Sequence, residues 1–294
     1  MRRGFAVLVF LLCGLNGLQS ATLPPGKVFV NRLKFDALVA KARAGGWERL
    51  PLGARTARVG LALAGTPYVN YTLELHDRIE VPSVNMDGMD CWTFFEIALG
   101  TARALGSSPS PRPEDLLAMV EMDRYRGGRS DGTFVSRLHH LEDWSHDNAR
   151  RGLVEDITPR LLGARRLQRD MAYMGKNWKS FRQLRANPSL VPKMQRIEKQ
   201  ISDRGIYYIP KAKVAAAEKH LRDGDVVSIV TTWPGTYTSH VGLAVRDKRG
   251  VLRFLHASRN HRKVVLDERL STYLAGNSKH MGIFVSRPID KATL

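Results

Sequence analysis

The feature that most constrains the fold is a strongly apolar stretch at residues 91–105. Phe95, Leu99 and Ala102 recur at spacings of four and three, which predicts an α-helix with an apolar face. Further apolar residues on either side widen that face, so most of the helix surface has to be buried. The chain must therefore supply other elements that cover this helix.

A series of short β-branched segments follows Asp223-Gly224-Asp225 and is the natural partner for the helix. Turn residues separate these segments, and consecutive strands with short connections form antiparallel sheets. The predicted fold class is α+β, with a buried helix packed on an antiparallel sheet. The predicted strands are Val226 to Thr231, Ser239 to Arg246, Val251 to Ala257, Lys263 to Asp267 and Gly282 to Ser286.

Two further helices are predicted at residues 33–45 and 54–65, as an N-terminal cap on the core. Residues 113–222 are interpreted as a helical insertion. Its section from 160 to 204 has 12 Lys or Arg against three acids, counted from the sequence. This section is either a polymer-binding face or a solvated helical surface, and composition alone does not choose between them.

The N-terminus has the pattern of an export signal. Arg2 and Arg3 precede an apolar core that is too short to span a bilayer comfortably, and a plausible cleavage site follows near Ala21. We therefore expect residues 1–21 to be a signal peptide and the mature protein to be periplasmic or secreted. A lipoprotein signal at Cys13 is a weaker alternative. Residues 22–294 are expected to form a single domain.

The net charge of +18, from 46 basic and 28 acidic residues, suggests attraction to anionic polymers of the cell envelope. General solubility explains the same charge equally well. No nucleic-acid-binding motif is visible, and export argues against one. The expected protein is a monomer without a stable membrane anchor.

Removal of the signal leaves Cys91 as the only cysteine. An unpaired cysteine in an exported protein is intermolecular, buried and inert, or a reactive thiol. Cys91 lies at the predicted start of the apolar helix, where unpaired amide N–H groups stabilise a thiolate. Asp90 and Asp87 are candidate caps for this helix. Cys91 is thus the candidate nucleophile.

Two histidines on neighbouring predicted strands are candidates for the base and its orienting partner. His240 shares a strand face with Gly242 and Ala244, and this small face is expected to admit the helix that carries Cys91. A three-residue turn would place His256 directly opposite His240. A nucleophile, a base and an orienting group form a recurring catalytic set.

A zinc site is a weaker alternative. His139, His140 and His146 lie close together in the sequence, but no HExxH motif is present. No metal and no cofactor are therefore expected.

The chain resembles the NlpC-type papain-like cysteine peptidases in a series of short motifs, and it is most similar to a branch described as N-acetylmuramoyl-L-alanine amidase-like. The resemblance spans about residues 55–288. The motifs of the superfamily are Gly65-Thr66-Pro67-Tyr68, Asp90-Cys91, Gly224-Asp225-Val226-Val227, Ser239-His240-Val241-Gly242 and His256-Ala257-Ser258. Those of the branch are Ser136-Arg137-Leu138-His139 with Asp143-Trp144, Tyr207 to Lys211, and Gly282 to Pro288.

This resemblance implies a papain-like fold and a cysteine-dependent amidase that acts on peptidoglycan or its muropeptide fragments. The implied bond joins the lactyl group of N-acetylmuramic acid to L-alanine. The resemblance also implies that Tyr68 lines the cleft beside Cys91. Trp92, Asn70-Tyr71 and Trp233 to Tyr237 depart from the usual motifs, which puts substrate choice in question.

Arg126 and Arg137 are candidates for binding the carboxylates of a stem peptide, because arginine pairs with carboxylates in a bidentate geometry. Structural ion pairs are an equally good explanation of both. Two other functions remain open. One is an endopeptidase that cuts between D-glutamate and diaminopimelate, and the other is a non-catalytic peptidoglycan-binding protein.

Overall fold

The computed structural model describes residues 23–290. The predicted signal peptide and Cys13 lie outside the described residues. The helices are α1 (Pro25–Val28), α2 (Arg32–Ala44), α3 (Leu52–Ala62), α4 (Cys91–Ser107), α5 (Pro113–Arg124), α6 (Leu141–Arg150), α7 (Tyr173–Lys176), α8 (Arg182–Ala186), α9 (Val191–Arg204), α10 (Lys211–Ala217) and α11 (Leu270–Ala275). The strands are β1 (Phe29–Val30), β2 (Val84–Asn85), β3 (Val154–Asp156), β4 (Arg165–Leu167), β5 (Ile206–Pro210), β6 (Val226–Thr231), β7 (Thr238–Arg246), β8 (Leu252–Ser258), β9 (Lys263–Arg269) and β10 (His280–Pro288).

The described residues form one large antiparallel sheet of eight strands in the order β4-β5-β10-β6-β7-β8-β9, with β3 also paired to β10. The four consecutive strands β6 to β9 follow one another through short connections, and β10 returns to lie beside β6. The prediction of an antiparallel sheet combined with helices is thus confirmed.

The segment 113–222 is not purely helical, which corrects the sequence interpretation. It contributes β3, β4 and β5 to the sheet, and β5 pairs with β10 at Ile209↔Ile283. Its residues Ile206 to Ile209 are β-branched or aromatic and lie between Gly205 and Pro210, a strand pattern that is easily overlooked in five residues. The segment is therefore partly integrated with the sheet.

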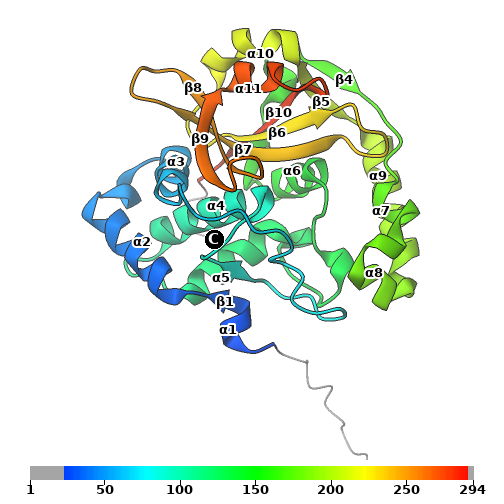
Figure 1. Ribbon diagram of the computed structural model, residues 1–294, viewed down its shortest axis with the longest axis horizontal. Coiled ribbons are helices and arrows are strands. Elements are labelled where there is room, and N and C mark those ends of the chain that lie inside the picture. Colours follow the sequence, from blue (N-terminus) through cyan, green and yellow to red (C-terminus); the bar gives the residue numbers. More distant parts are fainter. Residues whose placement is uncertain (1–22, 291–294) are drawn as a thin grey trace, which may run out of the picture.

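Helices cover both faces of the sheet, as Figure 1 shows: α3, α4 and α6 lie on one side, and α10 and α11 on the other. The larger apolar cluster joins α3, α4 and α6 to Val241, Leu243 and Leu255 of β7 and β8. A second cluster joins α10 and α11 to Ala244 and Phe254 on the opposite face. Helices α7 to α9 surround a third cluster beyond one end of the sheet.

Helix α4 is central to the larger cluster and is buried along almost its whole length. Two of its buried residues, Glu96 and Arg103, are charged. Glu96 accepts a hydrogen bond from Arg124 Nε at 2.7 Å, and neither side chain of this pair is exposed to solvent. Arg124 Nη1 also donates to the carbonyl of Ser83 at 2.9 Å, so the pair ties α4 to α5 and to the loop before Cys91. Within residues 23–290, no helix is both long and apolar enough to cross a membrane.

Candidate active site

Cys91 is the first residue of α4, directly after the residue that caps the helix. Asp90 Oδ1 accepts the Thr93 amide at 2.8 Å, while Thr93 Oγ1 accepts the Asp90 amide at 3.0 Å. This reciprocal capping provides acceptors for the backbone N–H groups of Asp90 and Thr93 and fixes the backbone around Cys91. Asp87 is not a cap, contrary to the prediction, because its carboxylate is bound by Lys34 and Asn31.

The Cys91 thiol is a neutral group in its resting environment. Burial raises its pKa to about 12, and the Asp90 carboxylate adds to this effect. The backbone N–H groups of Val241, Trp92 and Cys91 itself act in the opposite direction, but they do not outweigh burial. The expectation that the helix N-terminus yields a thiolate is therefore wrong, since desolvation exceeds the contribution of the helix.

His240 and His256 are in direct contact, with 2.6 Å between His240 Nε2 and His256 Nδ1. Their register differs from the prediction, however. Leu243 pairs with Leu255, so the residue opposite His256 is Gly242 and not His240. A Cβ atom at Gly242 would lie 2.8 Å from Cβ of His256, and the absence of this atom leaves room for the diagonal contact between the two rings.

The register differs because the turn between β7 and β8 has five residues instead of three. The Asp247 side chain accepts the amides of Arg249 and Val251, and the Asp247 amide donates to the Val251 carbonyl. A wider turn moves the pairing by two positions, which preserves the face of every side chain. The two histidines therefore stay on one face.

A β-bulge sets the direction of the His240 side chain. Ile229 pairs with His240 and Val230 pairs with Thr238, which leaves Ser239 as one extra residue in β7. Directly paired residues point to the same face, so His240 follows Ile229 toward α11, whereas Thr238 follows Val230 toward α4 and α6. Bulges of this kind re-aim side chains near functional sites.

The helix that carries Cys91 does not pack on the small face formed by Gly242 and Ala244, which corrects a second expectation. Helix α4 packs on the opposite face, where Val241 and Leu243 provide the larger apolar surface. The thiol reaches β7 through the backbone N–H of Val241, the residue after His240. The Cys91 thiol thus contacts the backbone of the residue that directly follows His240 in β7.

Asp267 extends the pair of histidines and was not identified from the sequence. Its Oδ2 lies 3.0 Å from Nε2 of His256. Asp267 is the last residue of the predicted strand 263–267 and follows two residues after Val265, which pairs with His256. This position in the strand was the available sequence signal for a contact with His256. Although burial acts to raise the pKa of Asp267, the hydrogen bond from His256 keeps it below the usual value.

The ionised Asp267 fixes the tautomer of both rings. A carboxylate only accepts, so His256 Nε2 carries the proton that is donated to it. Burial lowers the pKa of His256, so this ring is neutral and its Nδ1 accepts from His240 Nε2. Burial, with the charges of His256 and His280, also lowers the pKa of His240. The remaining nitrogen, His240 Nδ1, is consequently unprotonated and can accept a proton.

Tyr68 lies beside the thiol. Its amide donates to the carbonyl of Arg262, the residue before β9, and Tyr68 forms a parallel bridge with Met89, two residues before Cys91. Burial, together with the negative charges of Cys91 and Asp90, raises the pKa of the Tyr68 hydroxyl to about 12. Tyr68 therefore remains a protonated hydrogen-bond donor that borders the site.

Both candidate arginines are engaged in ion pairs. Arg126 Nη2 contacts Asp143 Oδ2 at 2.6 Å, and Arg204 binds the other oxygen of the same carboxylate. Arg137 Nε lies 3.5 Å from Glu80, and its guanidinium is stacked on Phe134. These partners support the structural explanation, and a role in substrate binding stays a prediction.

The three clustered histidines are dispersed into separate environments. His139 contacts the Phe134 carbonyl, His140 is buried between Glu142 and Glu198, and His146 borders a cavity. In the part of the chain that the structure describes, no group of three His, Cys, Asp or Glu residues is placed to hold a metal ion.

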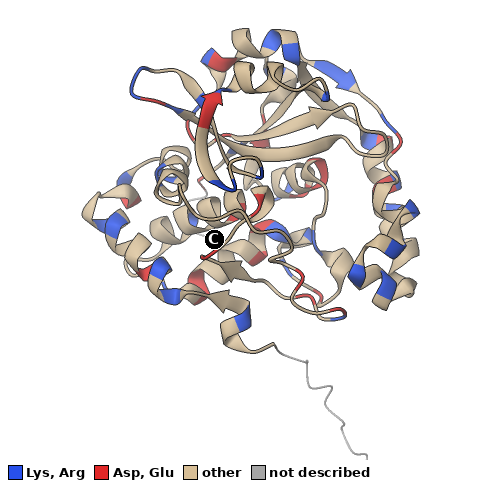
Figure 2. Cartoon of the chain, in the orientation of Figure 1, with Lys and Arg blue, Asp and Glu red and all other residues tan. Residues whose placement is uncertain are grey.

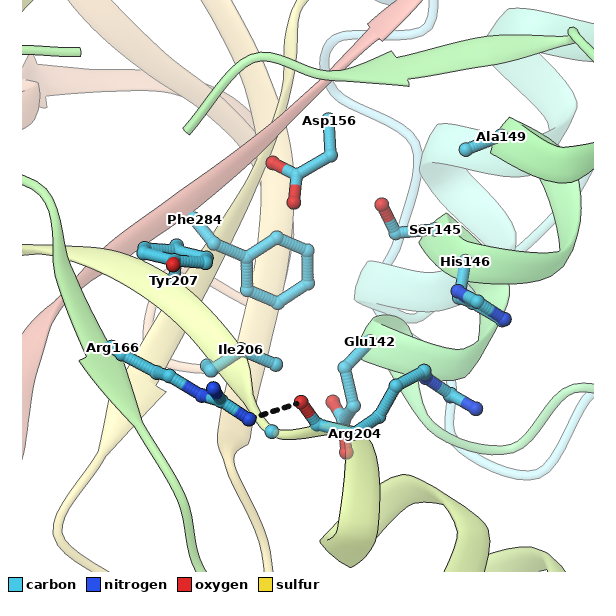
Figure 3. A pocket seen from close by; sticks show the side chains of 11 residues that line it. Glu142, Ser145, His146, Ala149, Asp156, Arg166, Arg204, Ile206, Tyr207 and Phe284 are labelled. Carbon is cyan, nitrogen blue, oxygen red and sulfur yellow. Dashed lines mark hydrogen bonds between the residues drawn. The ribbon is translucent and has the colours of Figure 1, made fainter. Parts of the chain in front are cut away.

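Figure 3 shows that cavity, of about 370 Å³, between α6, β4, β5 and β10. Phe284 and Tyr207 lie on one side of it, and Glu142 lies near Arg166 and Arg204. Glu142 Oε2 accepts the Thr238 hydroxyl at 3.2 Å, but Oε1 is buried without a hydrogen bond. Burial raises the pKa of Glu142 to about 7.

Replacing this carboxyl in E142Q is expected to stabilise the protein at pH 8 relative to pH 4. The folded state favours protonated Glu142, so its contribution is fully present below the usual pKa and is lost as the pH rises through about 7. The relative gain is about 3 kcal/mol in the free energy of unfolding. Denaturant titrations at both pH values measure it, with the exposed Glu268→Gln as control. Equal effects of E142Q at both pH values would contradict the raised pKa.

The basic section lies mainly on α7 to α9, where Figure 2 shows Lys and Arg in excess over acidic residues. Several of these side chains are exposed, among them Arg185, Arg196 and Lys199. This surface is therefore available to an anionic polymer, and such binding remains a proposal.

Comparison with known proteins places the chain in a family. The model of AmiA-like, N-acetylmuramoyl-L-alanine amidase-like proteins matches residues 58–283. An N-acetylmuramoyl-L-alanine amidase from Bacteroides uniformis is 32% identical with a TM-score of 0.74, over 81% of this chain and 99% of that chain. The chain therefore belongs to the AmiA-like family, and this membership supports a cell-wall amidase in general.

Two other structures are also similar. A Bacteroides fragilis protein named as a "putative xylanase" is 34% identical with a TM-score of 0.71, over 78% of this chain and 98% of that chain. A Legionella pneumophila protein is 20% identical with a TM-score of 0.66, over 88% and 94%, and supports the fold alone. No curated protein matches the chain.

Proposed function

We propose that this protein is a papain-like cysteine amidase that hydrolyses the bond between N-acetylmuramic acid and L-alanine in peptidoglycan or its fragments. The observation that carries the proposal is the hydrogen-bonded series Asp267, His256, His240, which leaves an unprotonated His240 nitrogen directly before Val241, the residue whose backbone N–H contacts the Cys91 thiol. Family membership supplies the class of bond. Export to the periplasm or cell surface belongs to the same proposal.

In the first half of the reaction, His240 Nδ1 removes the thiol proton as Cys91 Sγ attacks the lactyl carbonyl. General-base assistance is needed because the buried thiol is neutral at rest. The backbone N–H groups of Cys91 and Trp92 donate to the oxyanion. The carbon–nitrogen bond then breaks, and His240 gives its proton to the departing alanine nitrogen.

The second half regenerates the enzyme. Water attacks the thioester while His240 Nδ1 accepts one of its protons, and the carbon–sulfur bond breaks as the lactyl carboxylic acid is released. The proton on His240 returns to Cys91 Sγ. Asp267 takes no proton in this scheme; it keeps His256, and through it His240, in the required tautomer. The reaction needs no cofactor.

Digestion of defined muropeptides by the purified protein, read by mass spectrometry, tests the proposal. Release of intact stem peptides that begin with L-alanine supports the amidase. Release of fragments that begin with diaminopimelate supports the alternative endopeptidase. Binding of peptidoglycan without any cleavage would reject both enzymes and favour the non-catalytic binding protein.

The Asp267→Asn substitution is expected to lower kcat by about 10-fold to 100-fold while changing KM little. The amide retains the shape but can present an N–H group to His256, which favours the wrong tautomer in both rings. The acid limb of the pH profile should also move, because the carboxylate supports protonation of His256. An unchanged kcat and an unchanged pH profile would exclude Asp267 as a positioning residue. The exposed Asp203→Asn is a suitable control.

A further inference from the structure

A second and larger cavity, of about 730 Å³, lies between α7 and the loop that joins β6 to β7. Its size is within the range of small-molecule sites. The loop contains Trp233 to Tyr237, the segment that departs from the family motifs and has no role in the proposed catalysis. A ligand bound in this cavity would contact the loop at Trp233 to Thr236.

Two large aromatic side chains line this cavity and remain half exposed. Trp233 is 53% exposed and Tyr173 is also 53% exposed. Single exposed aromatic residues are common on protein surfaces. Two of them that border one cavity, from segments 60 residues apart in the sequence, form a concentrated apolar surface that stays accessible to solvent.

The loop that carries Trp233 is held rigidly. Arg169 Nη1 donates to the carbonyls of Thr231 and Thr236 at 2.7 Å each and to that of Trp233 at 3.2 Å. The Tyr237 hydroxyl accepts the Arg169 amide at 2.8 Å. These bonds order the loop during folding, so a ligand meets a preformed surface and loses less conformational entropy on binding.

The same contacts fix the loop against the segment that carries Tyr173. The Gly235 carbonyl accepts the amides of Ala172 and Tyr173 at 3.3 Å each. Gly235 has a φ of +74°, a left-handed conformation that other residues rarely adopt. The segments that carry Trp233 and Tyr173 are therefore joined by these hydrogen bonds.

The cavity borders the candidate active site. It is lined by Thr238 and by Ser239, the bulged residue directly before His240. Thr238 points toward the face on which α4 packs, and its hydroxyl donates to Glu142 of α6. A ligand in the cavity would thus lie beside the end of β7 that carries His240 and whose Val241 backbone contacts the Cys91 thiol.

The chemistry of the lining favours a sugar over a peptide. Flat aromatic surfaces accept the C–H face of a pyranose, and Asn177 and Ser239 offer polar atoms for its hydroxyl and acetamido groups. A stem peptide presents carboxylates, for which a free guanidinium is the expected partner. The nearby Arg169 is instead occupied by backbone carbonyls, and Lys176 is near Asp170.

We propose that Trp233 and Tyr173 form a saccharide subsite that holds the N-acetylmuramic acid ring while the scissile amide lies at Cys91. This inference rests on the proposed function, since it assigns the glycan side of the same substrate. Trp233 contributes the larger stacking surface, and Tyr173 the second wall.

Two substrates with the same scissile bond separate the sugar contribution from the chemistry. One is N-acetylmuramoyl-L-alanyl-D-isoglutamine, and the other is the D-lactoyl-L-alanyl-D-isoglutamine that lacks the sugar. Trp233→Ala is expected to lower kcat/KM by roughly 10-fold for the first substrate and less than 2-fold for the second. Trp233→Phe should retain most of the activity. Tyr207→Ala, an exposed aromatic residue at the cavity of Figure 3, should change neither value.

An equal loss on both substrates, or no loss on either, would overturn the subsite. Failure of the proposed function has a different signature, namely that the wild-type protein cleaves neither substrate. In that case calorimetric titration of N-acetylmuramic acid into the wild-type protein and into Trp233→Ala still tests whether this cavity binds the saccharide. Binding that is lost in the variant supports the saccharide subsite, and binding that is absent or equal in both rejects it. Thermal unfolding of each variant confirms that it is folded.

Discussion

Replacing Cys91 with alanine is expected to reduce muropeptide hydrolysis at least about ten-thousand-fold, to the level of the uncatalysed background. His240→Ala should lose a similar factor, and the double variant little more, because a nucleophile and its base act as one unit. Single-turnover assays with mass spectrometry measure the loss. The physical reason is that the raised pKa keeps the thiol neutral, so its attack requires a base that takes the proton.

The exposed His220→Ala provides the matched control and should retain full activity. Retention of more than about one per cent of the activity in Cys91→Ala would contradict cysteine catalysis. Additive losses in the double variant would show that Cys91 and His240 act independently. Either result would leave the family assignment intact but would require another nucleophile.

Truncating Glu96 to alanine is expected to cost about 3–5 kcal/mol in the free energy of unfolding, the largest effect on stability that we predict. The substitution leaves Arg124 buried, fully charged and without its carboxylate. Equilibrium denaturation measures the loss. The combined Glu96→Leu and Arg124→Met variant should recover much of it, because removing both charges removes the uncompensated cation.

The pair formed by Lys199 and Asp203 is the control for this prediction. Both side chains are largely exposed, and Asp203→Ala should cost less than about 1 kcal/mol. A small effect of Glu96→Ala would mean that water reaches Arg124. Because Arg124 also holds the Ser83 carbonyl, the destabilised variant is expected to lose activity as the loop before Cys91 loosens.

The elements with a strong periodic signal were predictable from the sequence. The apolar pattern located the helix that begins at Cys91, and β-branched runs located β6 to β10 within one or two residues. Strand β5 was missed, because a five-residue strand next to Gly205 carries little pattern of its own. Its place is determined by β10, which is more than 70 residues away in the sequence.

The site was predictable as a set of residues but not as a geometry. Neighbouring strands brought His240 and His256 together, but the turn length depended on side-chain bonds of Asp247 that no periodicity reveals. The direction of His240 depended on the bulge at Ser239. The ion pairs of Arg126 and Arg137 likewise depend on partners brought by the tertiary fold.

The extra residue at Ser239 also has a consequence for divergence within the family. The bulge adds one residue to β7, so the alternation of side chains between the two faces of the sheet is interrupted at Ser239. Changes of composition in the loop at 232–237 therefore need not rotate the imidazole of His240. A duplicated copy of this gene can acquire a new loop, and with it a new ligand preference, while inheriting the hydrolytic residues unchanged.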